Sequence, residues 1–210
     1  AISAFYPAVG SLLAWFLLKE KMSLKQVIAL IVALVGVMVI GISTAAGEGN
    51  GNVFVGIVGV IACVFGWGSE AVILAWGMQD DAVDNETALQ IRETTSAFAY
   101  GLIILPLAGS VEFTSQVAVT PANAVVFIAA LAGTASYLFY YKAIDSIGAS
   151  RGMALNISYS AWSVIFAALA GIILPAIMPE AIPSPLTVIC CIVIIVGTVL
   201  SATPDWNELL

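Results

Sequence analysis

A carboxylate and a guanidinium occur inside apolar segments of this 210-residue chain, where charged groups are rarely placed. Glu70 lies about seven residues before the end of the apolar segment 53–77, roughly 10 Å deep at about 1.5 Å per residue. Arg92 lies at a similar depth in the next apolar segment. Ionisable groups at such depth in a bilayer are costly, so each is a candidate for function.

Three interpretations of Glu70 are open. In the first, Glu70 forms an ion pair with Arg92 that holds two helices together. In the second, Glu70 faces a central cavity, where it attracts a cation or exchanges a proton; the two interpretations are compatible. In the third, the helix ends earlier and Glu70 lies in water.

Tyrosines form a second group of candidates. Tyr137, Tyr140 and Tyr141 share one helix face, because their spacing is i, i+3, i+4. Amphipathic aromatic residues normally occupy the membrane interfaces. This interpretation suits Tyr140 and Tyr141, since Lys142 follows them directly. The competing interpretation is that this face lines a binding site.

Three further aromatic residues lie deeper. Trp67, Tyr159 and Trp162 are roughly 13–18 Å from the helix ends, where an N–H or O–H needs a partner or a wet cavity. Several aromatic faces with one carboxylate, and no Lys or Arg near the midplane, favour a desolvated cation. Quaternary ammonium is the obvious case, because cation–π attraction needs no hydrogen bond.

The amino-acid composition indicates that most of the chain lies within a lipid bilayer. Hydrophobic residues make up 61% and charged residues only 9% of the sequence, and the mean hydropathy is +1.09. A soluble domain usually carries about 25% charged residues. The net charge of −7 gives no basic face for a nucleic acid. We therefore expect an integral membrane protein with no nucleic-acid partner.

The usual catalytic and metal-binding side chains are missing from the sequence. It contains no histidine, and Cys63, Cys190 and Cys191 lie in apolar runs without metal-binding spacing. No phosphate-binding loop occurs either, which disfavours ATP-driven transport. We expect no catalytic residue, no metal and no cofactor, and we do not expect an enzyme.

Seven apolar segments are long enough to cross a bilayer, at about 20 residues each. The expected fold is therefore all-α, with seven transmembrane helices. The segments are 1–18, 24–43, 53–77, 87–108, 123–144, 150–175 and 185–203.

The basic residues all mark one side of this arrangement, since they flank the first, third and fifth connections. They are Lys19, Lys21, Lys25, Arg92, Lys142 and Arg151. The positive-inside rule assigns that side to the cytoplasm. The C-terminal tail, 204–210, is then cytoplasmic too.

An internal repeat is visible in the sequence. Residues 6–14 resemble residues 159–167, and the helices that follow end in similar patterns. The two copies are five helices apart, an odd number, so they run across the membrane in opposite directions. Inverted repeats are typical of secondary transporters, whose substrate site lies near the midplane between the halves.

The repeat suggests how the chain divides. We expect 1–43 to hold the last two helices of a first five-helix repeat and 53–203 to hold a complete second repeat. Three helices of the first repeat would then be missing upstream of Ala1.

The stretch from Tyr6 to Lys21, followed by a helix with Gly36 and Gly41, resembles the close of an EamA repeat. That repeat defines the drug/metabolite transporter superfamily. The resemblance covers essentially the whole chain. It implies ten helices in two inverted five-helix repeats, of which the first three helices are missing here.

A narrower resemblance rests on four motifs that follow one another in order: 67–70, 91–92, 136–141 and 155–162. They are similar to the choline-uptake branch of the superfamily, found in bacterial lic operons. This resemblance implies a bacterial inner or plasma membrane protein that holds choline or a related quaternary amine in an aromatic pocket. The implied substrate-binding residues are Trp67, Glu70, Tyr137, Tyr141, Tyr159 and Trp162.

The expected function is secondary transport by alternating access. Trp67, Tyr159 and Trp162 would stack on the ammonium group of the substrate. Glu70 would neutralise its charge or carry a coupling proton. A coupling cation and a homodimer are both compatible with this expectation.

Two alternatives remain at the level of sequence. A related transporter could export amino acids or other small metabolites, with Arg92 recognising a carboxylate. A non-transport seven-helix membrane protein is less favoured, because retinal attachment needs a mid-helix lysine and Lys142 lies at a helix end.

Overall fold

The computed structural model describes residues 5–43, 53–80, 82–173 and 183–206. Among these residues every regular element is helical and no strand occurs. The longer helices are α2 (Leu24–Ser43), α3 (Val53–Gly77), α4 (Asn85–Ala99), α7 (Ala122–Ile147), α9 (Tyr159–Ile173) and α10 (Pro185–Ala202). The shorter ones are α1 (Tyr6–Leu17), the π-helix η2 (Tyr100–Ile104), α5 (Leu105–Leu107), α6 (Val111–Ala118) and α8 (Ala149–Asn156).

The helices are those of a multi-pass membrane protein. In the described part of the chain, five are long and apolar enough to cross a bilayer, and a sixth counts if a bent pair forms one span. The prediction of seven spans stays a prediction, because α1 has 12 described helical residues. Residues 1–4, at the start of the first predicted span, lie outside the described residues.

Two predicted spans, 24–43 and 53–77, coincide with α2 and α3. The fourth predicted span, 87–108, corresponds to α4, η2 and α5 in succession. The chain then turns by 120° into α6, a helix that the sequence analysis did not predict. Its polar residues separate it from the flanking apolar runs, which is why hydropathy alone assigned it to a connection.

The sixth predicted span, 150–175, is broken in the structure. It consists of α8 and α9, with a turn at Ile157 and Ser158 between them. The amides of Ser158 and Ser160 bond to carbonyls three residues back, at 3.0 and 3.1 Å, instead of four. Hydropathy did not reveal this break, because the segment 149–173 is apolar on average even though α8 is much less apolar than α9. Residues 174 and 175 of the predicted span lie outside the described residues.

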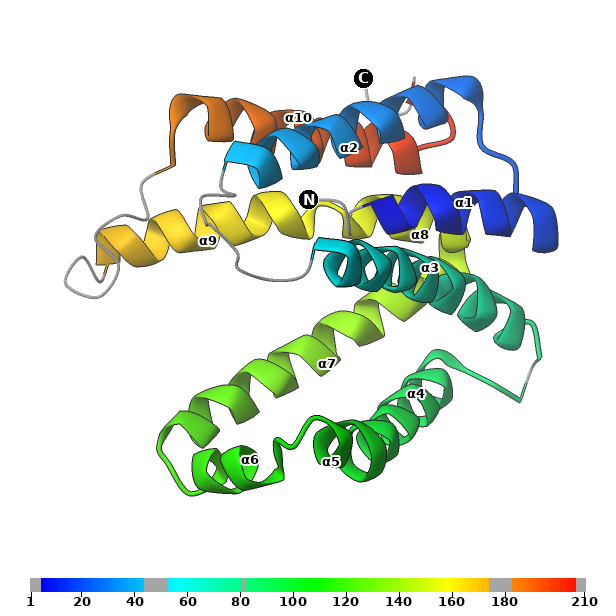
Figure 1. The fold of residues 1–210 in the computed structure, drawn as a ribbon. Helices are drawn as coiled ribbons and strands as arrows, with labels where there is room; N and C mark the ends of the chain where they lie inside the picture. The colour runs from blue at the N-terminus through cyan, green and yellow to red at the C-terminus, as the bar shows by residue number, and fades with distance from the viewer. Residues whose placement is uncertain (1–4, 44–52, 81, 174–182, 207–210) are drawn as a thin grey trace.

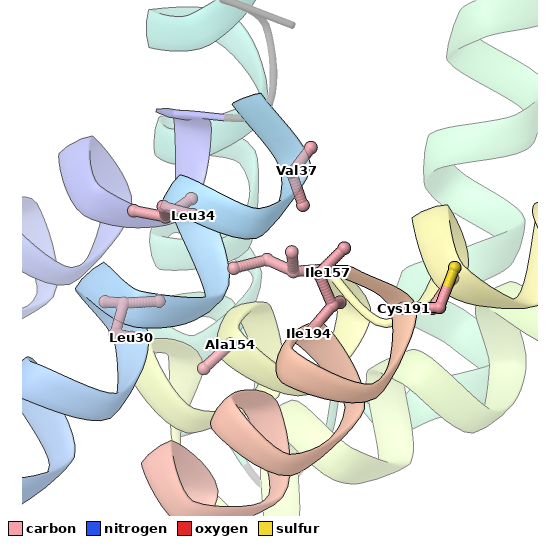
Figure 2. Packing of buried hydrophobic residues seen from close by; sticks show 8 residues of the cluster. Leu30, Leu34, Val37, Ala154, Ile157, Cys191 and Ile194 are labelled. Atoms are coloured by element: carbon pink, nitrogen blue, oxygen red, sulfur yellow. The ribbon is translucent and has the colours of Figure 1, made fainter. Parts of the chain in front are cut away.

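The helices pack in layers, with α2 and α10 side by side above α1, α8 and α9 (Figure 1). Figure 2 shows the cluster that joins these layers, where Leu34 of α2 and Ile194 of α10 meet Ile157 after α8. A Cβ on Gly197 would lie 3.0 Å from the Ala29 carbonyl oxygen, so the two helices approach closely. Such small-residue contacts favour helix association in lipid.

Contacts between the connections place Lys25 and Lys142 at one end of the bundle, which we call the basic end (at the right in Figure 1). The contacts are Glu20 with Ala149 and Ser150, Lys142 with Glu86, and Lys25 with the Trp206 ring. Lys25 and Lys142 take part in these contacts, whereas Arg92 contacts Glu70, and the common side of all six basic residues stays a prediction. Its assignment to the cytoplasm stays a prediction, and residues 207–210 of the tail lie outside the described residues.

Candidate functional site

A cavity of about 310 Å³ lies where α1, α3, α7 and α8 converge. Helix packing brings its residues together from positions far apart in the sequence. The cavity is lined by Tyr6, Trp67, Glu70, Ser136, Tyr137, Tyr140, Asn156 and Tyr159. Its wall is thus mainly aromatic, and Glu70 is the charged residue in it.

Glu70 lies on α3, where it lines the cavity and also contacts α4 and α7. Its Oε1 accepts a hydrogen bond from Arg92 Nε at 3.0 Å and a longer one from the Tyr141 hydroxyl at 3.4 Å. The Glu70 side chain is 26% exposed and the Arg92 side chain 27%. Glu70 therefore pairs with Arg92 and also lines the cavity, while its attraction of a cation or exchange of a proton there stays a prediction.

Arg92 is occupied by protein groups. Besides its bond to Glu70, its guanidinium donates from Nη1 to Glu93 Oε1 at 2.7 Å. Its Cζ lies 4.2 Å from the centroid of the Tyr137 ring, a cation–π distance. Arg92 is not among the residues that line the cavity. Arg92 therefore contacts Glu70 and Tyr137 from outside the cavity and stabilises their positions.

The opposite wall joins α1, α3 and α8. Tyr6, at the start of α1, meets the Trp67 ring edge-on, with centroids 5.7 Å apart and planes at 83°. The Tyr6 hydroxyl accepts a 2.8 Å hydrogen bond from the side-chain amide of Asn156. Tyr6 of α1 therefore orients the Trp67 ring, and Asn156 of α8 in turn holds Tyr6.

The tyrosines of α7 form the third wall. Tyr137 and Tyr140 line the cavity, and their rings meet edge-on with centroids 6.2 Å apart. Tyr141 is 0% exposed and does not line the cavity; it contacts Tyr137 edge-on and donates to Glu70. Helix packing thus turns both rings inward, and the interfacial depth expected for Tyr140 and Tyr141 stays a prediction.

A second, wider hollow of about 590 Å³ adjoins the first. It contains Trp162, whose ring lies 6.2 Å from that of Phe166. The two hollows share Ser136, Tyr140, Asn156 and Tyr159. Trp162 is thus beside the Glu70 cavity rather than inside it, one turn of α9 beyond Tyr159.

Four of the six predicted substrate-binding residues meet in one cavity: Trp67, Glu70, Tyr137 and Tyr159. Their role in binding stays a prediction. The sequence analysis did not select Tyr6, Ser136, Tyr140 and Asn156, which line the same cavity. The sequence could have indicated two of them, because Tyr6 lies in the internal repeat 6–14 and Asn156 lies in the motif 155–162.

The wall of the cavity carries aromatic faces and one carboxylate. No Lys or Arg is among the residues that line either hollow. In the described part of the chain, no group of three His, Cys, Asp or Glu could hold a metal ion. Aromatic faces with a single carboxylate suit an organic cation, which binds by cation–π attraction and Coulomb attraction together.

Comparison with known proteins gives one informative match. No family model matches the chain. Over 164 residues, 78% of the chain, the sequence is 29% identical to Protein LicB of Haemophilus influenzae. The match covers 54% of LicB, so the chain spans about half the length of this relative. The chain is therefore a multi-pass membrane protein that is similar to LicB, and its regular elements are all helices in the part that the structure describes.

Proposed function

We propose that this protein is a secondary transporter of the bacterial cell membrane that moves choline or a related quaternary amine by alternating access. Its fold would be that of an EamA-type drug/metabolite transporter, with the C-terminus in the cytoplasm. The similarity to LicB and the number of apolar helices support a transporter-like membrane protein. The substrate class rests on the cavity.

The observation that carries the proposal is the composition of the cavity wall. Trp67, Tyr137 and Tyr159 present aromatic surface to a space of about 310 Å³, and Glu70 supplies a negative charge. A quaternary ammonium group has no N–H to donate, so aromatic faces, which attract it by cation–π interaction, can replace its hydration. Glu70 would neutralise the substrate charge or carry a coupling proton.

Export of a metabolite that carries a carboxylate is less well supported. That alternative assigned Arg92 to the substrate carboxylate. Arg92 is already bonded to Glu70 and Glu93 and lies over the Tyr137 ring. A substrate carboxylate would have to displace these contacts, at the cost of leaving Glu70 without its partner.

The test is radiolabelled choline uptake by the complete gene product in proteoliposomes. Trp67→Ala removes an aromatic face from the cavity, whereas Trp76→Ala removes the same side chain from an exposed site on the same helix. We expect Trp67→Ala to raise KM about tenfold or more, as the loss of about 1.5–2 kcal/mol of cation–π attraction would. Trp76→Ala should leave KM unchanged.

Competition measurements define the substrate class. Unlabelled quaternary amines should compete with choline, while a neutral isostere of choline without the positive charge should not. Equal effects of Trp67→Ala and Trp76→Ala, or the absence of saturable uptake by the wild type, would refute choline transport through this cavity.

A further inference from the structure

The connection between α1 and α2 binds the N-terminus of α8. Glu20 Oε1 accepts from the Ala149 amide at 2.8 Å, and Glu20 Oε2 accepts from the Ser150 amide at 2.9 Å. Amides at the start of a helix have no partner within it and carry partial positive charge. Both carboxylate oxygens of Glu20 are therefore used to join segments about 130 positions apart.

The backbone has positive φ angles on both sides of this contact. Gly148, just before α8, has φ +91°, and a Cβ at this position would lie 2.9 Å from Glu20 Oε1. Lys19, next to Glu20, has φ +58°, which is uncommon for a residue with a side chain. Such conformations persist where surrounding contacts hold them, and they often mark parts that function by moving.

The cavity is closed toward the basic end, where this contact lies. Ala14, Ile144, Ala149 and Met153 pack there in one cluster and are at most 1% exposed. Away from the basic end, by contrast, Trp67, Ser136 and Tyr159 are exposed. The packed cluster therefore closes the cavity toward the basic end, while cavity residues away from that end are exposed in the part of the chain that the structure describes.

We propose that Glu20 is the latch that keeps the path closed at the basic end, and that its two bonds break when the path opens there. Helix α8 is tied to α1 at both ends, by Glu20 at one and by the Asn156–Tyr6 bond at the other. Opening at the basic end separates the Glu20 contact, while the Asn156–Tyr6 bond acts as the pivot. The proposal rests on transport by alternating access, as proposed above, but not on the identity of the substrate.

The test measures access to the cavity without any substrate. In the complete gene product, with Cys63, Cys190 and Cys191 replaced by serine, Ser136→Cys places a reporter thiol in the cavity wall. A membrane-impermeant maleimide is applied to vesicles from each side. Labelling of a separate Lys21→Cys protein identifies the side on which the basic end lies.

Glu20→Gln keeps the shape of the side chain but loses the charge and one of its two acceptor oxygens. We expect labelling of the reporter from the basic side to rise about tenfold, as expected for the loss of one charge-assisted hydrogen bond. The matched control is Glu86→Gln, which removes an exposed carboxylate at the same end. Labelling in this control should equal that of the wild type.

Unchanged labelling in Glu20→Gln, or an equal rise in Glu86→Gln, would overturn the latch. If Glu20→Gln does not fold, Glu20→Asp keeps the charge but shortens the reach by one methylene, and labelling equal to wild type would then overturn it. Because the readout needs no substrate, a lack of choline uptake would count against the proposed substrate and leave the latch result standing.

Discussion

The side-chain amide of Asn156 and the hydroxyl of Tyr6 are 150 positions apart in the sequence and are joined by a 2.8 Å hydrogen bond. The bond ties the end of α8 to the start of α1, and it lies in the wall of the cavity. Through Tyr6 it also reaches Trp67, the ring that Tyr6 meets edge-on. One polar contact thus orients aromatic surface supplied by a third helix.

The Asn156–Tyr6 bond should appear as coupling in a double-mutant cycle. Tyr6→Phe and Asn156→Ala remove the same bond from opposite sides, and each should destabilise the protein by about 1 kcal/mol in addition to its own packing effect. The double variant should be destabilised by less than the sum of the two single variants, and this difference, the coupling energy, should be about 1 kcal/mol. Thermal unfolding in detergent measures all three, and strictly additive losses would show that the bond contributes nothing.

Exchanging the charges of Glu70 and Arg92 should separate the ion pair from the cavity carboxylate. Glu70→Gln and Arg92→Gln each remove the charged partner of the Glu70–Arg92 bond, which should cost about 1–3 kcal/mol, and less in Glu70→Gln because Arg92 keeps its bond to Glu93. Glu70→Arg combined with Arg92→Glu restores a pair but places a positive group at the cavity. We expect stability to recover only in part, because a carboxylate at position 92 lies beside Glu93 and loses the contact with the Tyr137 ring, and we expect cation uptake to stay lost. Recovery of uptake by the exchanged protein would assign Glu70 a structural role alone.

The sequence predicted the long helices well because apolar length is a strong and local signal. The bounds of α2 and α3 follow from it directly. It did not show the break at Ile157 and Ser158, where backbone bonds change register inside a segment that is apolar only on average. Hydropathy averages over about 20 residues, so a two-residue interruption has no effect on it.

The candidate site was predictable only in part, for a related reason. Spacing along one helix showed that Tyr137 and Tyr140 share a face. Which face of α7 turns toward α3 is set by packing between helices, and that depends on contacts far apart in the sequence. The inward position of Tyr140 and the Tyr6–Asn156 bond therefore required the structure.

The start of α4 should make a small contribution to stability that depends on pH. Asp84 caps this helix and accepts from the Thr87 amide at 2.8 Å. Hydrogen bonds from the Thr87 side chain and backbone hold the pKa of Asp84 below its ordinary value. Because the folded-state pKa is lowered, the contribution is present above the ordinary pKa of about 3.9 and is lost as pH falls through the folded-state pKa.

Asp84→Asn tests this pH dependence, since asparagine is an equally good cap but does not titrate. The melting temperature of the wild type relative to Asp84→Asn should fall as the pH drops below about 4, with all other carboxylates common to both proteins. A constant difference over this range would show that the cap carries no pH-dependent stability.

Replacement by alanine should have different effects on stability at two glycines of α3 that are two positions apart. A Cβ on Gly68 would lie 2.9 Å from the Gly10 amide nitrogen and from the Tyr6 carbonyl oxygen, which are backbone atoms of α1 that cannot rotate away. A Cβ on Gly66 would meet nothing within 4 Å. Gly68→Ala should therefore push α1 from α3, destabilise the protein by about 1–3 kcal/mol and displace Tyr6 from Trp67.

Gly66→Ala serves as the matched control, because it gains the same helix propensity, up to about 1 kcal/mol, without the clash. We expect Gly66→Ala to keep wild-type uptake and thermal stability, and Gly68→Ala to lose much of both. Equal behaviour of the two variants would mean that the close approach of α1 to α3 does not position the Tyr6–Trp67 wall. The pair therefore tests the aromatic site through the packing that positions it, with every side chain of the cavity left intact.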